Sequence, residues 1–159
     1  MELCDVYDES ETRTGRIVAR GTKLPQEEYY LVVQVWIRNE IGEYLVQQRA
    51  HHLTSGPGIW GTTAGYVLAG EDSISGAIRE VEEEMGIHLP PEHLRRFDRL
   101  KMDSLMQDLW LAEITKRSIG EPRLGPDVAD WKWISKAELM QMVRRGDFFA
   151  YSYLSTLPE

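Results

Sequence analysis

Seven stretches of the chain combine apolar residues with β-branched or aromatic ones over lengths typical of strands. Polar segments containing glycine or proline separate them, which is the pattern of a protein rich in strands. The third and fourth stretches flank Asn39 and Gly42, which predicts a hairpin, and residues 51–58 are predicted to form a loop. The first two stretches are expected to pair with each other. The predicted strands cover residues 3–8, 15–21, 29–38, 43–49, 59–67, 105–114 and 128–135.

The segment after residue 67 carries the start and stop signals of a helix. Asp72 is a suitable N-cap, because its side chain accepts a hydrogen bond from a free backbone N–H and its charge matches the helix dipole. Gly86 suits the left-handed residue that follows a helix. These signals predict a loop over 67–72 and a helix from about Ser73 to Met85.

A second helix is predicted near the C-terminus. Ser135 is its N-cap, Glu138 stands at the capping-box position, and the helix runs to about Arg145. The tail 148–157 is compatible with either a short helix or a strand. Because strands and helices intermingle without a regular βαβ alternation, we expect an α/β fold in which a mixed central sheet has helices on both faces.

Length and composition suit a single soluble domain covering residues 1–159. The polar N-terminus has no signal-peptide core, and no apolar run is long enough to span a bilayer. The only cysteine, Cys4, rules out an internal disulfide, which suits a reducing compartment. We therefore expect a cytoplasmic protein with no membrane partner.

The net charge of −8 narrows the class of ligand. No dense stripe of Lys and Arg offsets it, which argues against a nucleic-acid polymer as a partner. A small anion remains compatible with an acidic protein if a metal ion or a few well-placed basic groups neutralise its charge.

The first predicted helix contains the candidate chemistry, a cluster of acidic side chains. Glu80, Glu83 and Glu84 have i, i+3 and i+4 spacing, which predicts that they lie together on one face. Arg79 precedes Glu83 by four residues, and no lysine occurs anywhere between residues 65 and 87. The opposite face is predicted to carry an apolar stripe of Ile74, Ala77, Ile78, Val81 and Met85.

Two interpretations of this cluster are open at the level of single residues. Charge runs are usually solvated faces, so an exposed acidic face is one interpretation. The other is a site for a divalent cation, because three carboxylates with a single arginine leave unbalanced negative charge. Ligands that are all oxygen favour Mg²⁺ or Mn²⁺ over zinc.

The spacing within residues 65–87 is specific. It consists of Gly65, five residues, Glu71, seven residues, Arg79-Glu80-Val81, one residue, Glu83-Glu84, one residue, and Gly86-Ile87. With single-residue frequencies of roughly 5–7%, seven fixed residues match a given start by chance about once in 10⁸ or more rarely. The segment resembles the Nudix box in every specified position. This resemblance favours the metal interpretation and implies a Nudix-type α/β/α sandwich.

The resemblance also implies a function and a cofactor. Nudix proteins mostly hydrolyse a nucleoside diphosphate linked to another moiety, or a related organic diphosphate. A small-molecule diphosphate would be the substrate and Mg²⁺ (or Mn²⁺) the cofactor. Glu80, Glu83 and Glu84 would bind the metal, and the backbone carbonyl of Ala64 would complete its shell.

The remaining residues of the motif have implied supporting roles. Arg79 would orient the acidic cluster, and Glu71 would support the junction between loop and helix. Gly65 and Gly86 would form backbone turns. Glu80 is the first candidate for the base that takes a proton from the attacking water, although some family members use a later acidic residue. The later candidates are Asp108, Glu113, Glu121 and Asp127.

Outside the box, the chain is similar to the branch of the superfamily that contains isopentenyl-diphosphate isomerase. That isomerase has a catalytic cysteine just before the box glycine and a metal-ligand histidine just after it. Here Ala64 and Tyr66 occupy these positions, and Cys4 is far away in the sequence. Isomerisation needs groups that transfer protons to and from carbon, so hydrolysis is the expected reaction. A Nudix-fold domain that binds a ligand without turnover is the alternative, and isomerisation is third.

Three residues near the box are candidates for substrate contacts. Arg49 ends a predicted strand and has the geometry for a bidentate phosphate contact. His51 lies in the loop that follows, and Tyr66 comes directly after the box glycine. Related enzymes are often dimers, so a homodimer is an alternative to a monomer.

Overall fold

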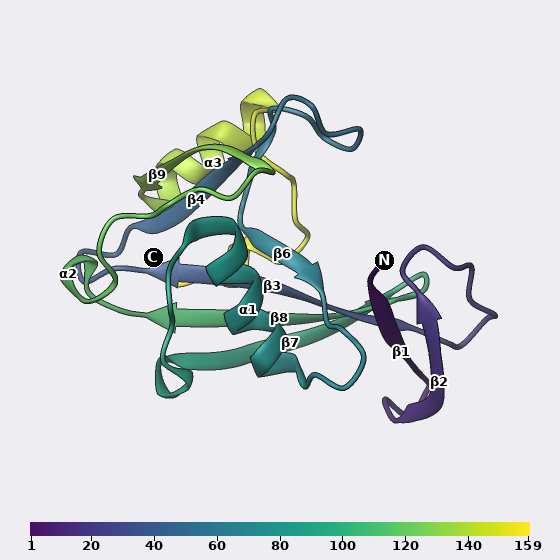
Figure 1. Cartoon of the computed structure of the whole chain (residues 1–159). Coiled ribbons are helices and arrows are strands. Elements are labelled where there is room, and N and C mark those ends of the chain that lie inside the picture. Colours follow the sequence, from purple (N-terminus) through teal and green to yellow (C-terminus); the bar gives the residue numbers. More distant parts are fainter.

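The computed structural model describes all 159 residues, and its main body is a seven-stranded mixed sheet (Figure 1). Strand β3 pairs in parallel with β8, whereas every other pairing in this sheet is antiparallel. The order is β5-β4-β3-β8-β7, with β6 on β3 and β9 on β4. The strands are β3 (Tyr30–Arg38), β4 (Tyr44–Arg49), β5 (Trp60–Gly61), β6 (Thr63–Tyr66), β7 (Leu94–Met102), β8 (Leu105–Glu113) and β9 (Val128–Ile134).

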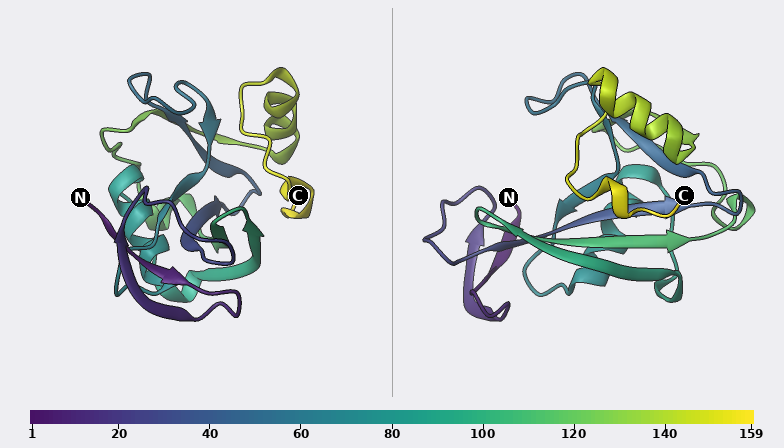
Figure 2. Two further views of the ribbon diagram at one scale, coloured as in Figure 1. Left: turned by 90° about the vertical axis from the view of Figure 1, so that its right-hand side faces the viewer. Right: turned by 180° about the vertical axis from the view of Figure 1, so that it is seen from behind.

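Helices cover both faces of this sheet, as expected. Helix α1 (Ser73–Met85) lies on one face, and α3 (Lys136–Arg145) with the C-terminal segment lies on the other (Figures 1 and 2). Because side chains alternate along β3, Val33 and Val35 pack with the buried residues of α1 while Trp36 packs with those of α3. The prediction of an α/β/α sandwich with a mixed central sheet is confirmed.

The N-terminal residues form a separate two-stranded sheet of β1 (Leu3–Tyr7) and β2 (Arg13–Ala19). This hairpin stands at one end of the molecule (Figure 1) and is joined to β3 by backbone hydrogen bonds between Tyr7 and Tyr29. The predicted pairing of the first two strands is therefore confirmed.

The predicted helix boundaries are also confirmed, and local hydrogen bonds explain them. The Asp72 side chain accepts from the Ser75 N–H at 2.9 Å, and Gly86 ends α1 in the left-handed conformation with φ of 65°. The Ser135 hydroxyl accepts from the Glu138 N–H at 3.1 Å at the start of α3. In the tail, residues Leu154–Thr156 form one short 3₁₀ turn (η2), so the helical alternative holds there.

The predicted hairpin of β3 and β4 is confirmed, although Arg38 and Tyr44 are its one paired position, since β6 pairs with β3 further along. Two details of the strand prediction are wrong. The single strand predicted over 59–67 is two strands separated at Thr62, whose hydroxyl donates to the Val35 carbonyl. Strand β7 was not predicted, because it is an edge strand in which charged residues mask the alternation.

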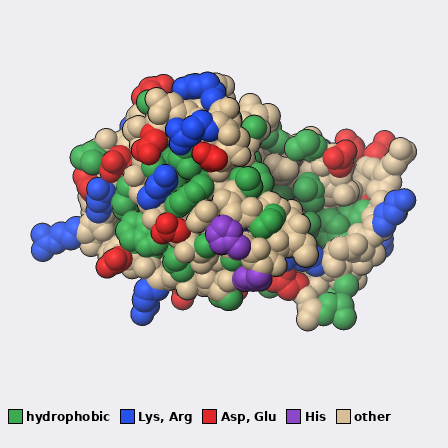
Figure 3. All heavy atoms as spheres, turned by 90° about the horizontal axis from the view of Figure 1, so that it is seen from above, with side chains coloured by type: hydrophobic (Ala, Val, Ile, Leu, Met, Phe, Trp, Pro, Cys, Tyr) green, Lys and Arg blue, Asp and Glu red, His purple; other side chains and the backbone are tan.

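The remaining elements are two short connections between strands, the helix α2 (Lys116–Ile119) and the 3₁₀ turn η1 (Pro91–His93). No helix combines the length and the apolar character needed to cross a bilayer. Seen from above, acidic and basic side chains are interspersed over the surface (Figure 3).

Candidate active site

Helix α1 packs against strand β6, and its tightest approach is between Glu80 and Gly65. A Cβ atom at position 65 would lie 2.1 Å from the Glu80 carboxyl carbon, so any side chain there would displace the Glu80 carboxyl group. Gly65 lies in β6, where no positive φ is needed, and the predicted turn at this glycine is wrong. Its role is to leave space for Glu80. Gly86, in contrast, does adopt the predicted turn conformation.

Arg79 connects the helix to the loop that precedes it. Its guanidinium donates to both Glu71 oxygens, at 2.7 and 3.0 Å, and to the Tyr66 carbonyl at 2.9 Å. The same group reaches Glu80 at 3.0 Å and Glu83 at 3.2 Å. Glu71 in turn accepts from the Leu68 N–H at 2.8 Å, so its contacts are those expected at a loop–helix junction. Burial raises the pKa of Glu71, but the hydrogen bonds from Arg79 lower it, and the net shift of this pKa is downward.

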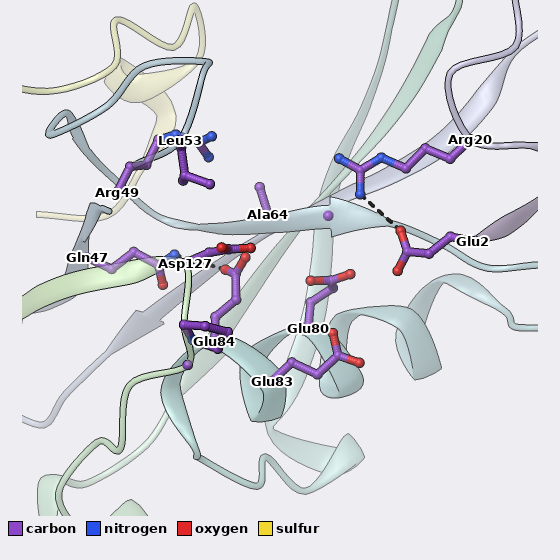
Figure 4. Close-up of a pocket in the computed structure, with 13 residues that line it drawn as sticks. Glu2, Arg20, Gln47, Arg49, Leu53, Ala64, Glu80, Glu83, Glu84 and Asp127 are labelled. Atoms are coloured by element: carbon purple, nitrogen blue, oxygen red, sulfur yellow. Dashed lines mark hydrogen bonds and ion pairs between the residues drawn. The ribbon is translucent and has the colours of Figure 1, made fainter. Parts of the chain in front are cut away.

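The acidic face of α1 borders a cavity of about 490 Å³ (Figure 4). Figure 4 shows the three glutamates on one side, Arg49 and Leu53 near one end, and Arg20 with Glu2 near the other. Strand β6 contributes Ala64 between them. The lining residues come from the N-terminal hairpin and its surroundings (Glu2, Arg20), from β4 and the loop after it (Gln47, Arg49, Leu53), from β6 (Ala64, Gly65), from α1 (Glu80, Glu83, Glu84) and from the segment before β9 (Gly125, Pro126, Asp127).

The three glutamates have different surroundings. Glu80 is only 8% exposed, and burial raises its pKa to about 7 although Arg79 opposes the shift. Burial also raises the pKa of Glu84 to about 7, although a hydrogen bond from the Gln47 amide at 2.9 Å favours its ionised form. Glu83 is exposed. The prediction that all three lie opposite the apolar stripe is therefore wrong for Glu80, which faces the sheet beside Val81.

The side chains do not form a ready metal-binding cluster in this conformation. No group of three or more His, Cys, Asp or Glu side chains is close enough together to hold an ion. Glu80 and Glu83 contact Arg79, whereas Glu84 contacts Gln47. The donor set nevertheless fits a hard divalent cation. Burial raises the pKa of both Glu80 and the half-buried Glu84, and all three glutamates border one cavity together with Ala64.

The other predicted site residues are divided between the cavity and its surroundings. Arg49 lines the cavity, and its Nε donates to the Ser55 carbonyl at 2.8 Å. His51 is exposed and does not line the cavity. Tyr66 also lies outside the lining, and its ring instead packs under the Arg20 guanidinium at 4.4 Å.

One of the four later candidates for the base lies at the cavity. Asp127 lines it, and its carboxylate is 3.3 Å from the His52 ring. Asp108 is fully buried and bonded to Arg99 at 2.5 Å, which is a structural role. The other two, Glu113 and Glu121, are exposed and do not line the cavity.

Several lining residues were not predicted. Gln47 is buried between Glu84, to which it donates, and the Thr63 hydroxyl, which donates to it at 2.9 Å. Glu2 and Arg20 form an ion pair of 3.0 Å at the far end of the cavity. They reach it only because the N-terminal hairpin returns to β6, which no local pattern in the sequence indicates.

The residues that distinguish an isomerase are missing from the cavity. Ala64 is the lining residue just before Gly65, and no thiol or imidazole is among the lining residues. Cys4 is buried in β1 with 1% of its surface exposed and lies outside the lining. No residue that lines this cavity therefore has a thiol that could transfer a proton to or from carbon.

Comparisons with known proteins show which family the chain is similar to. The family model described as NUDIX domain matches residues 28–156. A Nudix hydrolase of Listeria monocytogenes, itself described as uncharacterized, is 32% identical over 158 residues, covering 99% of this chain and 94% of that protein. An isopentenyl-diphosphate isomerase of Paenarthrobacter aurescens is 25% identical over 147 residues, covering 87% and 78%. A crystal structure of a Deinococcus radiodurans protein shares the fold, with a TM-score of 0.74 at 20% identity, covering 98% of this chain and 96% of that chain.

Proposed function

The chain belongs to the Nudix family and is a Nudix hydrolase, and from that premise we propose that it cleaves the pyrophosphate bond of a small organic diphosphate with the help of Mg²⁺ or Mn²⁺. The substrate class is a nucleoside diphosphate derivative or a related organic diphosphate. The observation that carries the proposal is the cavity in which three glutamates of one helix face two arginines.

The metal ligands in this proposal are Glu80, Glu83, Glu84 and the carbonyl of Ala64. When bound there, a divalent cation neutralises charge on the diphosphate oxygens and makes a nearby water more acidic. The chain supplies the ligand oxygens, and its cavity shields the site from bulk solvent. Arg79 holds Glu71, Glu80 and Glu83 in place, so it is a positioning residue.

Two arginines are placed to bind the phosphate groups. Arg49 and Arg20 line the cavity toward opposite ends (Figure 4), and each guanidinium offers several N–H donors to phosphate oxygens. They also explain how a protein of net charge −8 holds a polyanion. Their positive charge is concentrated where the substrate lies.

Two carboxylates at the cavity can take the proton from the attacking water. Glu80 is the first candidate, and Asp127 is the second because it lines the same cavity without contacting Arg79. Asp127→Asn distinguishes them, because Asp127 is not a metal ligand in this proposal. If Asp127 is the base, Asp127→Asn should lower kcat by about 10²–10⁴ and remove the acid-side fall of the pH–rate profile, whereas if Glu80 is the base, the variant should keep both the kcat and the fall.

A non-catalytic ligand-binding domain is the alternative function. All seven fixed residues of the box are present, and its supporting contacts through Arg79 and Glu71 are formed, which favours turnover. Isomerisation is third, since Ala64 replaces the thiol.

The proposal is tested with a panel of nucleotide sugars, dinucleotides, nucleoside triphosphates and isoprenoid diphosphates, each assayed with Mg²⁺ and with Mn²⁺. Glu83→Gln and Glu84→Gln should lose most turnover and keep the fold. Glu82→Gln is the matched control, because Glu82 is an exposed glutamate of the same helix that does not line the cavity. Tight binding of one compound without cleavage would support the ligand-binding alternative, and isomerised product without released phosphate would support the third.

A further inference from the structure

The hairpin of β1 and β2 lies beside residues 67–72, the loop that leads into α1 and is called the box loop below (Figure 1). The hairpin precedes residue 28, where the match to the NUDIX domain model begins. Its contacts with the box loop are therefore not part of the resemblance to the Nudix box. They concern the site nevertheless, because this loop contains Glu71, to which Arg79 is bonded.

Three hydrogen bonds join the hairpin to three consecutive residues of the box loop. Two of them involve charged side chains of the hairpin, and the third is between backbone groups. Hydrogen bonds to charged groups are stronger than those between neutral groups. The bonds run from the Ala69 N–H to the Leu3 carbonyl at 2.8 Å, from the Gly70 N–H to the Asp5 carboxylate at 2.9 Å, and from the Arg13 guanidinium to the Glu71 carbonyl at 2.6 Å.

Asp5 is the buried member of this set. Only 8% of its surface is exposed, and its Oδ2 atom both accepts from the Gly70 N–H and lies 3.3 Å from Arg13 Nε. A carboxylate is costly to bury unless charged or hydrogen-bonding groups surround it, and these two groups are its partners. Asp5 therefore connects the backbone of the loop to the guanidinium that holds the next loop residue.

Gly70 depends on this contact more than on packing. Its φ is 84°, in the left-handed region, and a Cβ atom built there would meet no heavy atom within 4 Å. The Asp5 carboxylate is the protein group to which its N–H donates. The conformation of the loop at this glycine is therefore set by a hydrogen bond from the hairpin.

The box loop in turn holds the group that orients the glutamates. The Glu71 carboxylate accepts from Arg79 at 2.7 and 3.0 Å, and Arg79 also donates to Glu80 and Glu83. A shift of the Glu71 backbone would move Arg79 and with it both acidic side chains. A displacement of about 1 Å at a catalytic site can lower the rate by about 10²-fold.

On the basis of the proposed diphosphate hydrolysis, we propose that Asp5 is a positioning residue, which acts through its bond to the Gly70 N–H on the contact between Glu71 and Arg79. The hairpin then holds the site in its working geometry as well as carrying Arg20 to the cavity. Asp5 does not line the cavity that the glutamates border. It should therefore affect the rate of the reaction and not the binding of the substrate.

The variants Asp5→Ala and Asp5→Asn test this role together. Alanine removes the acceptor for the Gly70 N–H, so we expect kcat to fall at least about 10-fold while KM stays within about 2-fold. Both donors face Oδ2 of Asp5, so the single side-chain oxygen of Asp5→Asn can accept from both, and this variant should recover most of the lost kcat. An unchanged kcat in Asp5→Ala, a rise of KM alone, or an Asp5→Asn variant as slow as Asp5→Ala would each overturn the proposal.

Asp8→Ala is the matched control on the same hairpin. Asp8 accepts from the Ser10 N–H at 3.0 Å, the Ser10 hydroxyl at 2.7 Å and the Thr12 N–H at 3.0 Å, so it supports the turn between β1 and β2. It does not line the cavity. Asp8→Ala should lower the Tm and leave kcat and KM unchanged. If Asp8→Ala and Asp5→Ala lower kcat equally, the effect arises from the stability of the hairpin and the positioning role is wrong.

An NMR experiment on the metal-free protein separates this proposal from the hydrolase proposal, because it needs no turnover. The Nε–H signal of Arg79 is recorded in the wild type and the three variants. Asp5→Ala should shift this signal, since the bonded Glu71 moves, whereas Asp5→Asn and Asp8→Ala should leave it close to its wild-type position. A shift in Asp5→Ala alone supports the positioning contact even if no compound is cleaved, and the failure then belongs to the hydrolase proposal. A signal that is the same in Asp5→Ala and the wild type overturns the positioning role even if hydrolysis is demonstrated.

Discussion

A methyl group at position 65 would stand 2.1 Å from the carboxyl carbon of Glu80, so the Glu80 carboxyl group lies against strand β6 only because residue 65 is glycine. We therefore expect Gly65→Ala to displace this carboxyl group, to destabilise the fold by about 1–3 kcal/mol, and to abolish most hydrolysis. Thermal unfolding and turnover of the same preparation measure both effects.

The control for this prediction is the double variant Gly65→Ala/Glu80→Ala. Removing the Glu80 side chain makes room for the methyl group, so alanine at position 65 should cost far less stability in the Glu80→Ala background. Activity should stay low, because a proposed metal ligand is missing. Equal destabilisation in both backgrounds would show that the two residues do not oppose each other.

The sequence predicted those parts of the site whose contacts join residues close together in the chain, and it missed those whose contacts join distant segments. The bounds of α1 and the network of Arg79 with Glu71 are local, and capping residues with a fixed spacing predict them. The burial of Glu80 was mispredicted, because a helical wheel contains no information about the space that Gly65, a residue without a side chain, leaves in strand β6. Arg20 and Gln47 reach the cavity through contacts between distant segments, and no local pattern marks them.

The same distinction applies to the sheet. Strand positions follow from apolar and β-branched runs, so most strands were predicted, but partners do not follow from those runs. The turn residues predicted the hairpin of β3 and β4, whereas nothing in the runs indicated that β3 also pairs with β6 and β8. β7 contains four Arg or Lys residues among nine, and it was missed because its burial alternates only weakly.

Arg79→Lys should impair the enzyme although the charge is kept. Lysine cannot bond to both Glu71 oxygens and the Tyr66 carbonyl at once, so the loop before α1 loses its attachment. We expect a loss of about 1–3 kcal/mol in the free energy of unfolding and at least about a 10-fold fall in kcat. Arg95→Lys, an exposed arginine of β7, should change neither quantity. Wild-type activity of Arg79→Lys would argue against the positioning role.

Arg20→Gln should weaken substrate binding more than it slows chemistry. Arg20 lines the cavity and is held over the Tyr66 ring at 4.4 Å, so its guanidinium is available to a phosphate group once Glu2 releases it. We expect KM to rise about 10-fold and kcat to stay within about 2-fold, because charge-assisted hydrogen bonds contribute about 1.5–3 kcal/mol. Steady-state kinetics at low and high salt measure both constants.

A matched control for Arg20 lies on the same hairpin. Arg16 pairs with Glu28 as Arg20 pairs with Glu2, but it does not line the cavity. Arg16→Gln should therefore leave KM unchanged. If both variants change KM equally, the effect arises from the stability of the hairpin and not from a phosphate contact. If neither does, Arg20 has no part in substrate binding.

The raised pKa values of Glu80 and Glu84 predict how the stability of the metal-free protein depends on pH. Burial raises the pKa of Glu80 from 4.5 to about 7, and that of Glu84 likewise, so between these pH values the folded protein binds more protons than the unfolded chain. The free energy of unfolding must then fall as pH rises through this window. We expect each carboxyl to contribute on the order of 1–3 kcal/mol to the fall. Thermal unfolding in a chelator, at a series of pH values, measures it.

Two comparisons assign that fall to the site. Glu80→Gln stays neutral at every pH, so the Tm of this variant should decline less steeply than that of the wild type between about pH 4.5 and about pH 7. Excess Mg²⁺ favours the ionised carboxylates, and it should therefore raise the Tm of the wild type most at the upper end of the window and little at the lower end. Glu82→Gln should retain both behaviours, because Glu82 is exposed and outside the cavity. A wild-type Tm that rises with pH in the chelator would mean that these carboxyls are not held in a desolvated site, and the metal assignment would lose its electrostatic basis.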